Sequence, residues 1–153
     1  MSDNAGVRVA PPLVYFVLSI LGGVIHSIIP VSLGLEIEIP YWGIAIISIP
    51  SMYIILAVMV IFRKRKTGLE PWSTTTAIVT SGPFRFSRNP IYVAFFIIPI
   101  GIAIKINSIW PLIMIGPIAL TVYHIAIKKE EAYLEAKFGQ EYVDYKSRVR
   151  RWI

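Results

Sequence analysis

The 153-residue sequence contains no cysteine and only two histidines, His26 and His124. The absence of cysteine excludes disulfide bonds, thiolate metal ligands and a cysteine nucleophile. Two histidines leave few ligands for a zinc or di-iron site, so we expect no metal centre. Charged residues are also scarce, at 16% of the chain against about 25% in soluble domains. With 56% hydrophobic residues, this composition excludes an ordinary soluble domain and indicates a membrane protein.

Long apolar stretches dominate the sequence. A helix needs about 20 mostly apolar residues to cross a bilayer. Four stretches are candidates, and we predict membrane spans over residues 13–33, 41–62, 90–104 and 109–127. The third is short, which indicates a tilted, partly interfacial or kinked helix, with Pro99 as the place for the kink. The predicted fold is an all-α polytopic membrane protein, one domain over residues 1–153, with cytosolic C-terminal helices over residues 128–149.

The distribution of charge predicts the topology. Thirteen of the 15 lysines and arginines fall within residues 63–88 and 128–151, after the second and fourth predicted spans. Positive residues favour the cytosolic side, so both termini are expected in the cytosol and the protein in the cytoplasmic membrane. Basic clusters beside apolar spans indicate anionic lipid rather than nucleic acid as the partner. We therefore expect the bilayer, and not nucleic acid, as the partner; the oligomeric state stays open.

The segment that leads into the third span has the features of an anion-binding site. Pro90 suits the first turn of a helix, and Asn89 is then the expected N-cap. The start of the helix presents free backbone N–H groups, and Arg85 and Arg88 add positive charge. A carboxylate would fit this arrangement. The alternative is that the arginines contact lipid phosphates and that Pro90 only starts a helix.

A second charged segment, Lys128-Lys129-Glu130-Glu131, directly follows the fourth span. Helical spacing places Ile127, Glu130 and Leu134 on one face, and His124, Lys128 and Glu131 on the neighbouring face. A carboxylate here could bind an ammonium group or ribose hydroxyls. The alternative is a solvated face on which Glu and Lys pair locally. Farther on, Gly139 predicts the end of this helix, and residues 141–149 predict a short amphipathic helix.

S-adenosylmethionine would match this set of groups. Its methionine part carries a carboxylate and an ammonium group, its ribose carries hydroxyls, and its adenine needs an apolar or aromatic slot. The two segments offer arginines, a helix start, carboxylates and the aromatic residues Phe84, Phe86 and Tyr92. Other zwitterionic ligands would fit the same groups, so this chemistry alone does not identify the cofactor.

Several short motifs resemble those of the isoprenylcysteine carboxyl methyltransferases, and phospholipid methyltransferases share much of the pattern. The motifs are Gly82-Pro83-Phe84-Arg85, Arg88-Asn89-Pro90-Ile91-Tyr92, the pair Glu130-Glu131, Phe138-Gly139-Gln140-Glu141-Tyr142, and Val149-Arg150-Arg151-Trp152-Ile153. The resemblance covers about residues 67–153 and implies a cytosol-facing pocket for S-adenosylmethionine. The first two spans carry no comparable motif.

The resemblance and the local chemistry together give the candidate cofactor-binding residues. They are Thr76, Ala77, Ile78, Val79, Arg85, Arg88, Asn89, Pro90, Ile91, Tyr92, Glu130 and Glu131. Four positions depart from the family. Asn89 and Thr76 replace histidines, and Phe84 replaces a tyrosine. Ala126 stands where the prenylcysteine enzymes have a substrate arginine, which leaves Lys128 and Lys129 as candidate substrate-binding residues.

The predicted function is methyl transfer from S-adenosylmethionine to a membrane-embedded or lipid-linked acceptor, such as a prenylcysteine-type carboxylate. No catalytic residue is identified, and the absence of an obvious base near Asn89 favours an acceptor that is already ionised. Two alternatives remain: a non-catalytic membrane module of the same fold, and a nicotinamide-dependent membrane reductase. His26 and His124 are expected to bond to neighbouring helices, and Trp72 is either an interface anchor or part of a lid.

Overall fold

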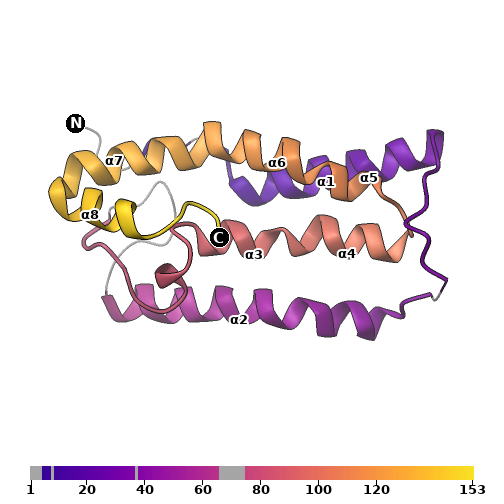
Figure 1. The fold of residues 1–153 in the computed structure, drawn as a ribbon, viewed down its shortest axis with the longest axis horizontal. Coiled ribbons are helices and arrows are strands. Elements are labelled where there is room, and N and C mark those ends of the chain that lie inside the picture. The colour runs from indigo at the N-terminus through magenta and orange to yellow at the C-terminus, as the bar shows by residue number, and fades with distance from the viewer. Residues whose placement is uncertain (1–4, 8, 37, 66–74) are drawn as a thin grey trace.

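The computed structural model describes residues 5–7, 9–36, 38–65 and 75–153, and over these residues it is a bundle of helices with no β-strand. The helices run side by side along one long axis (Figure 1). The end of α2, residues 75–89, α7 and α8 gather at one end, while the α1–α2 and α4–α5 connections lie at the other. The predicted all-α fold is therefore confirmed, and Trp72 lies outside the described residues.

Two long apolar helices open the bundle, α1 (Pro11–Ile28) and α2 (Tyr41–Arg65). Many of their large apolar side chains are exposed, and Phe16, Ile20 and Leu56 are each more than half exposed. Such exposed apolar surface is stable in lipid rather than in water. By length and hydropathy, α1, α2 and the continuous helical stretch Trp110–Phe138 can each cross a membrane, whereas Pro90–Lys105 is apolar but shorter. Three helices of the described residues are thus long enough to cross a membrane, and the third predicted span stays a prediction.

The first helix ends earlier than predicted. We expected the span to reach residue 33, but α1 stops at Ile28 and Ile29 is already extended, with φ −129° and ψ 84°. Pro30 is the physical reason, because a proline disfavours the helical conformation of the residue before it. Residues 29–33 then pair with the turn before α5, where the amide of Ile109 donates to the carbonyl of Val31 at 3.1 Å.

The third span is two short helices, α3 (Pro90–Phe95) and α4 (Ile97–Lys105), with an interruption at Phe96. The interruption fits the effect of Pro99, because a proline lacks an amide proton and crowds the preceding turn. The Phe96 amide donates to Val93 instead of Tyr92. The carbonyl of Tyr92 instead accepts a 2.7 Å hydrogen bond from the buried hydroxyl of Tyr15 in α1. The interruption therefore lets α1 bind the backbone of Tyr92, whose side chain lies in the candidate site.

The fourth span is also interrupted. It comprises α5 (Trp110–Ile113), α6 (Ile115–Val122), a π-helical segment η2 (Tyr123–Ile127) and α7 (Lys128–Phe138). The wide π turn changes the rotation of the residues that follow it. His124 and Lys128 are exposed while Glu131 is buried, although the three residues were predicted to lie along one face. Regular helical spacing could not anticipate this turn.

The turn between α4 and α5 is tight. Asn107 has a φ of +49°, and the amide of Ser108 donates to the carbonyl of Ala103, which closes the end of α4. The Asn107 side chain exchanges two hydrogen bonds with the backbone of Leu35. These bonds hold the α1–α2 connection against the turn at the end of the bundle opposite α8.

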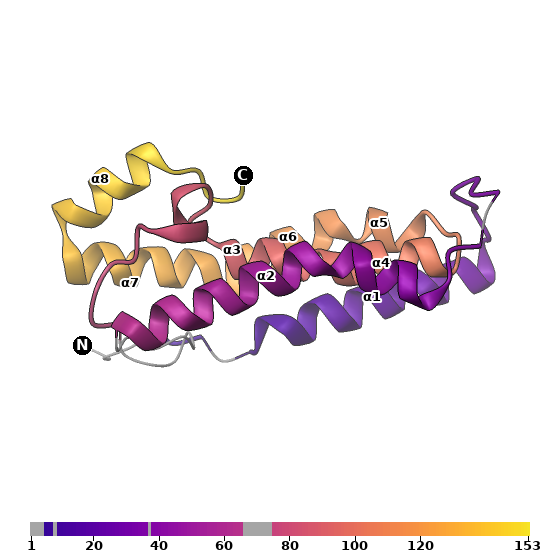
Figure 2. The ribbon, with the colours of Figure 1, turned by 90° about the horizontal axis from the view of Figure 1, so that it is seen from below.

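The chain reverses direction after α7. Gly139, with φ +54°, ends α7 as predicted, and α8 (Gln140–Arg148) follows. Figure 2 shows α8 folded back toward the start of α3. Tyr142 and Tyr145 form the buried face of α8, and the short 3-10 helix η1 (Gly82–Arg85) lies beside them, because the Tyr145 hydroxyl donates to the carbonyl of Phe84. This reversal closes one side of the candidate site.

Close packing of α1 on α5 gives a stability prediction. A Cβ atom at Gly22 would lie 2.9 Å from the backbone of Pro111, whereas one at Gly23 would meet nothing closer than 3.9 Å. Gly22→Leu should therefore destabilise the bundle by about 1–3 kcal/mol through overpacking. Thermal unfolding in detergent would measure the effect, with Gly23→Leu as the matched control. Equal melting temperatures for the two variants would contradict the packing.

Candidate functional site

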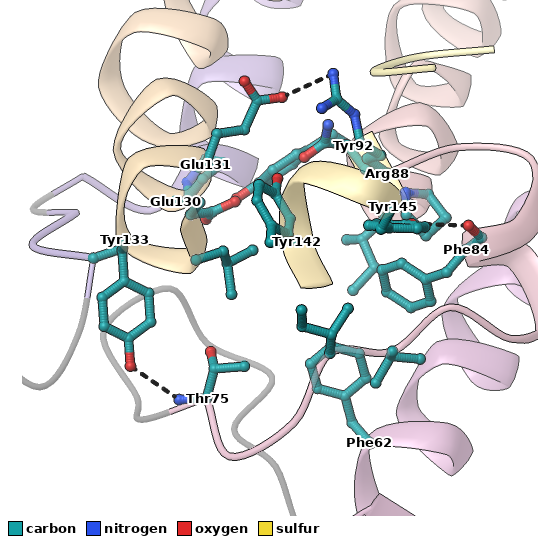
Figure 3. Close-up of a pocket in the computed structure, with 18 of the residues that line it drawn as sticks. Phe62, Thr75, Phe84, Arg88, Tyr92, Glu130, Glu131, Tyr133, Tyr142 and Tyr145 are labelled. Carbon is teal, nitrogen blue, oxygen red and sulfur yellow. Dashed lines mark hydrogen bonds and ion pairs between the residues drawn. The ribbon is translucent and has the colours of Figure 1, made fainter. Parts of the chain in front are cut away.

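A cavity of about 340 Å³ lies at the α7–α8 end of the bundle, among α2, residues 75–92, α7 and α8 (Figure 3). Its size lies within the range of about 300–1,000 Å³ that is common for small-molecule sites. The wall is mostly apolar and aromatic, and its charged side chains are Arg88, Glu130 and Glu131. Such a cavity suits a ligand with an apolar ring and a compact charged part.

Glu130 and Tyr92 join the two segments that the sequence analysis singled out. The Tyr92 hydroxyl donates a 2.6 Å hydrogen bond to Oε1 of Glu130, and both residues line the cavity. Tyr92 comes from the first turn of α3, and Glu130 comes from the first turn of α7. The segment before the third span and the paired glutamates therefore meet at one place.

Glu131 is engaged differently from its neighbour Glu130. Arg151 binds it bidentately, with Nε and Nη2 each 2.9 Å from a carboxylate oxygen. Arg88 adds a third contact, from Nη2 to Oε1 at 3.2 Å. Nε and Nη1 of Arg88 are buried without a hydrogen-bond partner in the part of the chain that the structure describes. Glu131 is thus the centre of an Arg–Glu–Arg cluster (Arg88, Glu131 and Arg151) beside the cavity.

Burial changes the acidity of groups in the site. Glu130 lies beyond the apolar part of the fourth span, and its burial raises the pKa of its carboxyl group, an effect that the charge of Glu131 reinforces and the Tyr92 hydrogen bond opposes. Burial, followed by the charge of Glu131, also raises the pKa of Tyr142 to about 12. A carboxyl group with a raised pKa gains most from a cationic partner, because the partner stabilises its charged form.

Asn89 occupies the N-cap position of α3, but its side chain does not cap the helix. Its Nδ2 donates at 2.9 Å to the carbonyl of Arg151, so the helix-capping role that we expected for this side chain is wrong. The same C-terminal segment accepts a second bond, from the amide of Arg88 to the carbonyl of Arg150 at 2.9 Å. These hydrogen bonds hold the segment before α3 against the end of the chain. Because the bonded residues are far apart in the sequence, the local sequence does not indicate these contacts.

Aromatic residues form the apolar part of the cavity. The rings of Phe62 in α2 and Phe84 in η1 lie 5.6 Å apart. Tyr145 is placed beside them by the bond from its hydroxyl to the Phe84 carbonyl. On the opposite side, the hydroxyl of Tyr133 accepts a 3.4 Å hydrogen bond from the Thr75 amide, which brings residues 75–79 against α7 (Figure 3).

Most of the predicted site residues line this cavity, and a few do not. Those that line it are Ala77, Ile78, Val79, Arg88, Asn89, Pro90, Ile91, Tyr92, Glu130 and Glu131. Thr76, Lys128 and Lys129 are exposed and do not line it. Arg85 is also exposed and lines a second groove, together with Tyr53 and Phe86.

Sequence reasoning missed several residues of the site. The largest omission is Arg151, which binds Glu131, and the others line the cavity: Ala5, Ala10, Pro11, Pro12, Phe62, Thr75, Tyr133, Leu134, Tyr142 and Tyr145. Arg151 and Tyr142 lie within the C-terminal motifs, so the motifs held a usable signal for them. Phe62 and the N-terminal residues carry no motif, and only the packing of the helices brings them to the site.

Comparisons with known proteins show which family the chain resembles. A family model described as phospholipid methyltransferase matches residues 41–141. Over 81 residues, or 50% of the chain, the sequence is 38% identical to the protein-S-isoprenylcysteine O-methyltransferase of Mus musculus, and the alignment covers 27% of that protein. The Schizosaccharomyces pombe protein of the same name is 31% identical over 72 residues, or 47% of this chain and 30% of the relative.

A Haemophilus influenzae protein described as uncharacterized is 53% identical over 34 residues, or 22% of this chain. The chain spans 54% of that protein and less than a third of the eukaryotic relatives. No solved structure is significantly similar to this chain of 153 residues. The apolar helices and these matches identify an integral membrane protein. Because the family model covers most of the chain, from the second span to the start of α8, the protein belongs to the phospholipid methyltransferase family.

Proposed function

We propose that this protein is a membrane methyltransferase that uses S-adenosylmethionine to methylate a lipid or lipid-linked acceptor. Family membership supports the reaction class. The observation that carries the proposal is the pairing of an acidic and a basic group in one apolar cavity, Glu130 held by Tyr92 and Arg88 in the Arg–Glu–Arg cluster. We also propose that residues 1–153 act as one domain that contains the whole site.

The residues of the cavity fit the proposed methyl donor. Glu130 is the candidate partner for its ammonium group, because the second carboxylate, Glu131, is already bound by two arginines. Arg88 supplies positive charge for its carboxylate, and its remaining N–H groups have no hydrogen-bond partner among the described residues. Phe62, Phe84 and the apolar residues 77–79 provide surface for its adenine. The donor supplies a methyl group on a positively charged sulfur.

The contribution of the protein to such a transfer is to position the reactants and exclude water. A displacement needs the nucleophile, the methyl carbon and the sulfur in line, so positioning should supply most of the rate enhancement. No histidine is among the residues that line the cavity in the described part of the chain, and Asn89 cannot act as a base. An acceptor that is already ionised, such as a lipid-linked carboxylate of the prenylcysteine type, needs no base. We propose this acceptor class.

The positive charges at the cavity end of the bundle support a cytosolic site. The end with the cavity also exposes Arg63, Lys64, Lys128 and Lys129. We propose that this end and both termini face the cytosol in the cytoplasmic membrane, as the positive-inside rule favours. A polar methyl donor could then bind from the cytosol while the acceptor stays in the lipid.

The direct test uses the purified protein in lipid nanodiscs with methyl-labelled S-adenosylmethionine and a panel of lipids and prenyl thiols. We expect a labelled product, identified by mass spectrometry as a methyl ester. Binding of the donor without any product would favour the non-catalytic module. Binding of a reduced nicotinamide dinucleotide in place of the donor would favour the reductase.

The raised pKa of Glu130 predicts a pH dependence of donor binding. The ammonium group of the donor binds the ionised carboxylate, and a raised pKa means that this form is lost at a higher pH than for an ordinary glutamate. Affinity for S-adenosylmethionine should therefore fall as the pH is lowered from about 8 to about 5, and the fall should begin at a higher pH than an ordinary glutamate would give. Calorimetric titration across this range measures the effect. An equally steep fall in Glu130→Gln would assign the dependence to another group.

A further inference from the structure

Three charged side chains beside the cavity form a cluster with an excess of positive charge. Arg88 and Arg151 both bind Glu131, so the cluster carries a formal charge of +1. The side chains of Arg88 and Glu131 are 8% and 11% exposed. Arg151 is 34% exposed, so water screens part of this charge, but the buried Arg88 still gains from a counter-charge that approaches it. The cluster should therefore attract the negative end of a ligand in the adjoining cavity.

Arg151 is held in place independently of Arg88. Its guanidinium lies 4.8 Å from the centre of the Tyr123 ring, a favourable cation–π contact. Its carbonyl accepts hydrogen bonds from Asn89 Nδ2 at 2.9 Å and from Ser87 Oγ at 3.3 Å. Arg151 binds Glu131 through two contacts of 2.9 Å, whereas Arg88 binds Glu131 through one contact of 3.2 Å. Arg151 is thus the principal counter-ion of Glu131.

Removing Arg151 would change how Arg88 is used. Glu131 would then have Arg88 as its one guanidinium partner in this cluster, and the two could form a closed bidentate pair. Such a pair has no net charge, and its N–H groups are occupied by Glu131. The cavity would lose the positive charge that a carboxylate needs, although Arg88 itself would still be present.

We propose that Arg151 is a positioning residue: by neutralising Glu131, it leaves Arg88 free to bind the anionic end of the ligand. The inference rests on the proposed function and deepens it, because it separates the two adjacent glutamates. Glu130 faces the ligand, and Glu131 serves as an internal counter-ion whose charge must be balanced by Arg151. The ligand end in question is a carboxylate, as S-adenosylmethionine carries.

The test compares the wild type with Arg151→Gln, Glu131→Gln and the double variant, each titrated with S-adenosylmethionine by calorimetry in nanodiscs. We expect Arg151→Gln to bind about tenfold more weakly. Glu131→Gln should bind at least as tightly as the wild type, and the double variant should recover to within about threefold of it. Arg148→Gln, an exposed change on α8, controls for the loss of a positive charge from this region.

A purely structural role predicts a different pattern. In that case both single variants would bind weakly, and the double variant would be no better than Arg151→Gln, which would overturn the proposal. Arg151→Lys keeps the charge but loses the bidentate contact with Glu131, so its affinity should lie between those of the wild type and Arg151→Gln, and thermal unfolding of each variant checks for a folding defect. Unchanged binding in Arg151→Gln would also overturn it. If the wild type itself does not bind the donor, the proposed function fails first, and this inference fails with it.

Discussion

Glu130→Gln is expected to weaken the binding of S-adenosylmethionine about 100-fold, the effect of losing a charge-assisted hydrogen bond in a buried site. Glutamine has nearly the same shape and can still accept the hydrogen bond from Tyr92, but it has no charge for the ammonium group of the ligand. Because burial already disfavours the charged form of Glu130, the neutral side chain should not unfold the protein. The loss would therefore report on binding rather than on stability.

Calorimetric titration in nanodiscs and thermal unfolding of the same samples would separate these two effects. Glu135→Gln is the matched control, since Glu135 is an exposed residue of α7 that pairs with Lys146 away from the cavity. We expect the control to bind like the wild type. A Glu130→Gln protein that binds with wild-type affinity would remove the central residue from the proposed site.

Arg88→Met is expected to weaken binding of the same ligand about 30-fold. The methionine keeps much of the buried aliphatic volume of Arg88 but removes the charge that the cluster offers to a carboxylate. Glu131 keeps its bidentate contact with Arg151, so it is not left as an unpaired buried charge. This retained pair limits the loss of stability that usually follows when one member of a buried ion pair is removed.

A ligand without the carboxylate shows whether Arg88 binds that group. S-Adenosylmethionine and an analogue without the carboxylate should differ strongly in affinity for the wild type but little for Arg88→Met. Arg63→Met, at the exposed end of α2, controls for a general change of charge at this end of the bundle. If Arg88→Met still discriminates between the two ligands, another group holds the carboxylate.

Segments with strong local signals were predictable from the sequence. Hydropathy indicates the apolar spans because each helix that crosses a bilayer needs its own run of mostly apolar residues of sufficient length. Gly139 marks the reversal between α7 and α8 because its positive φ is strained for other residues. The motifs around Tyr92 and Glu130 identify the two segments that contact each other. Even so, the predicted end of the first helix was wrong by several residues. Hydropathy alone would continue this helix, but Pro30 disfavours the helical conformation of the residue before it.

By itself, the sequence determined the class of protein, the approximate spans and the family, because composition, hydropathy and short motifs are properties of local segments. Only the tertiary structure decided the roles of Glu130 and Glu131, which are identical neighbours in the sequence. Glu130 meets Tyr92 of α3, while Glu131 meets Arg88 before α3 and Arg151 near the end of the chain. The reason is physical: the charge that a carboxylate can offer a ligand depends on which distant groups already neutralise it, and the packing of the chain places those groups.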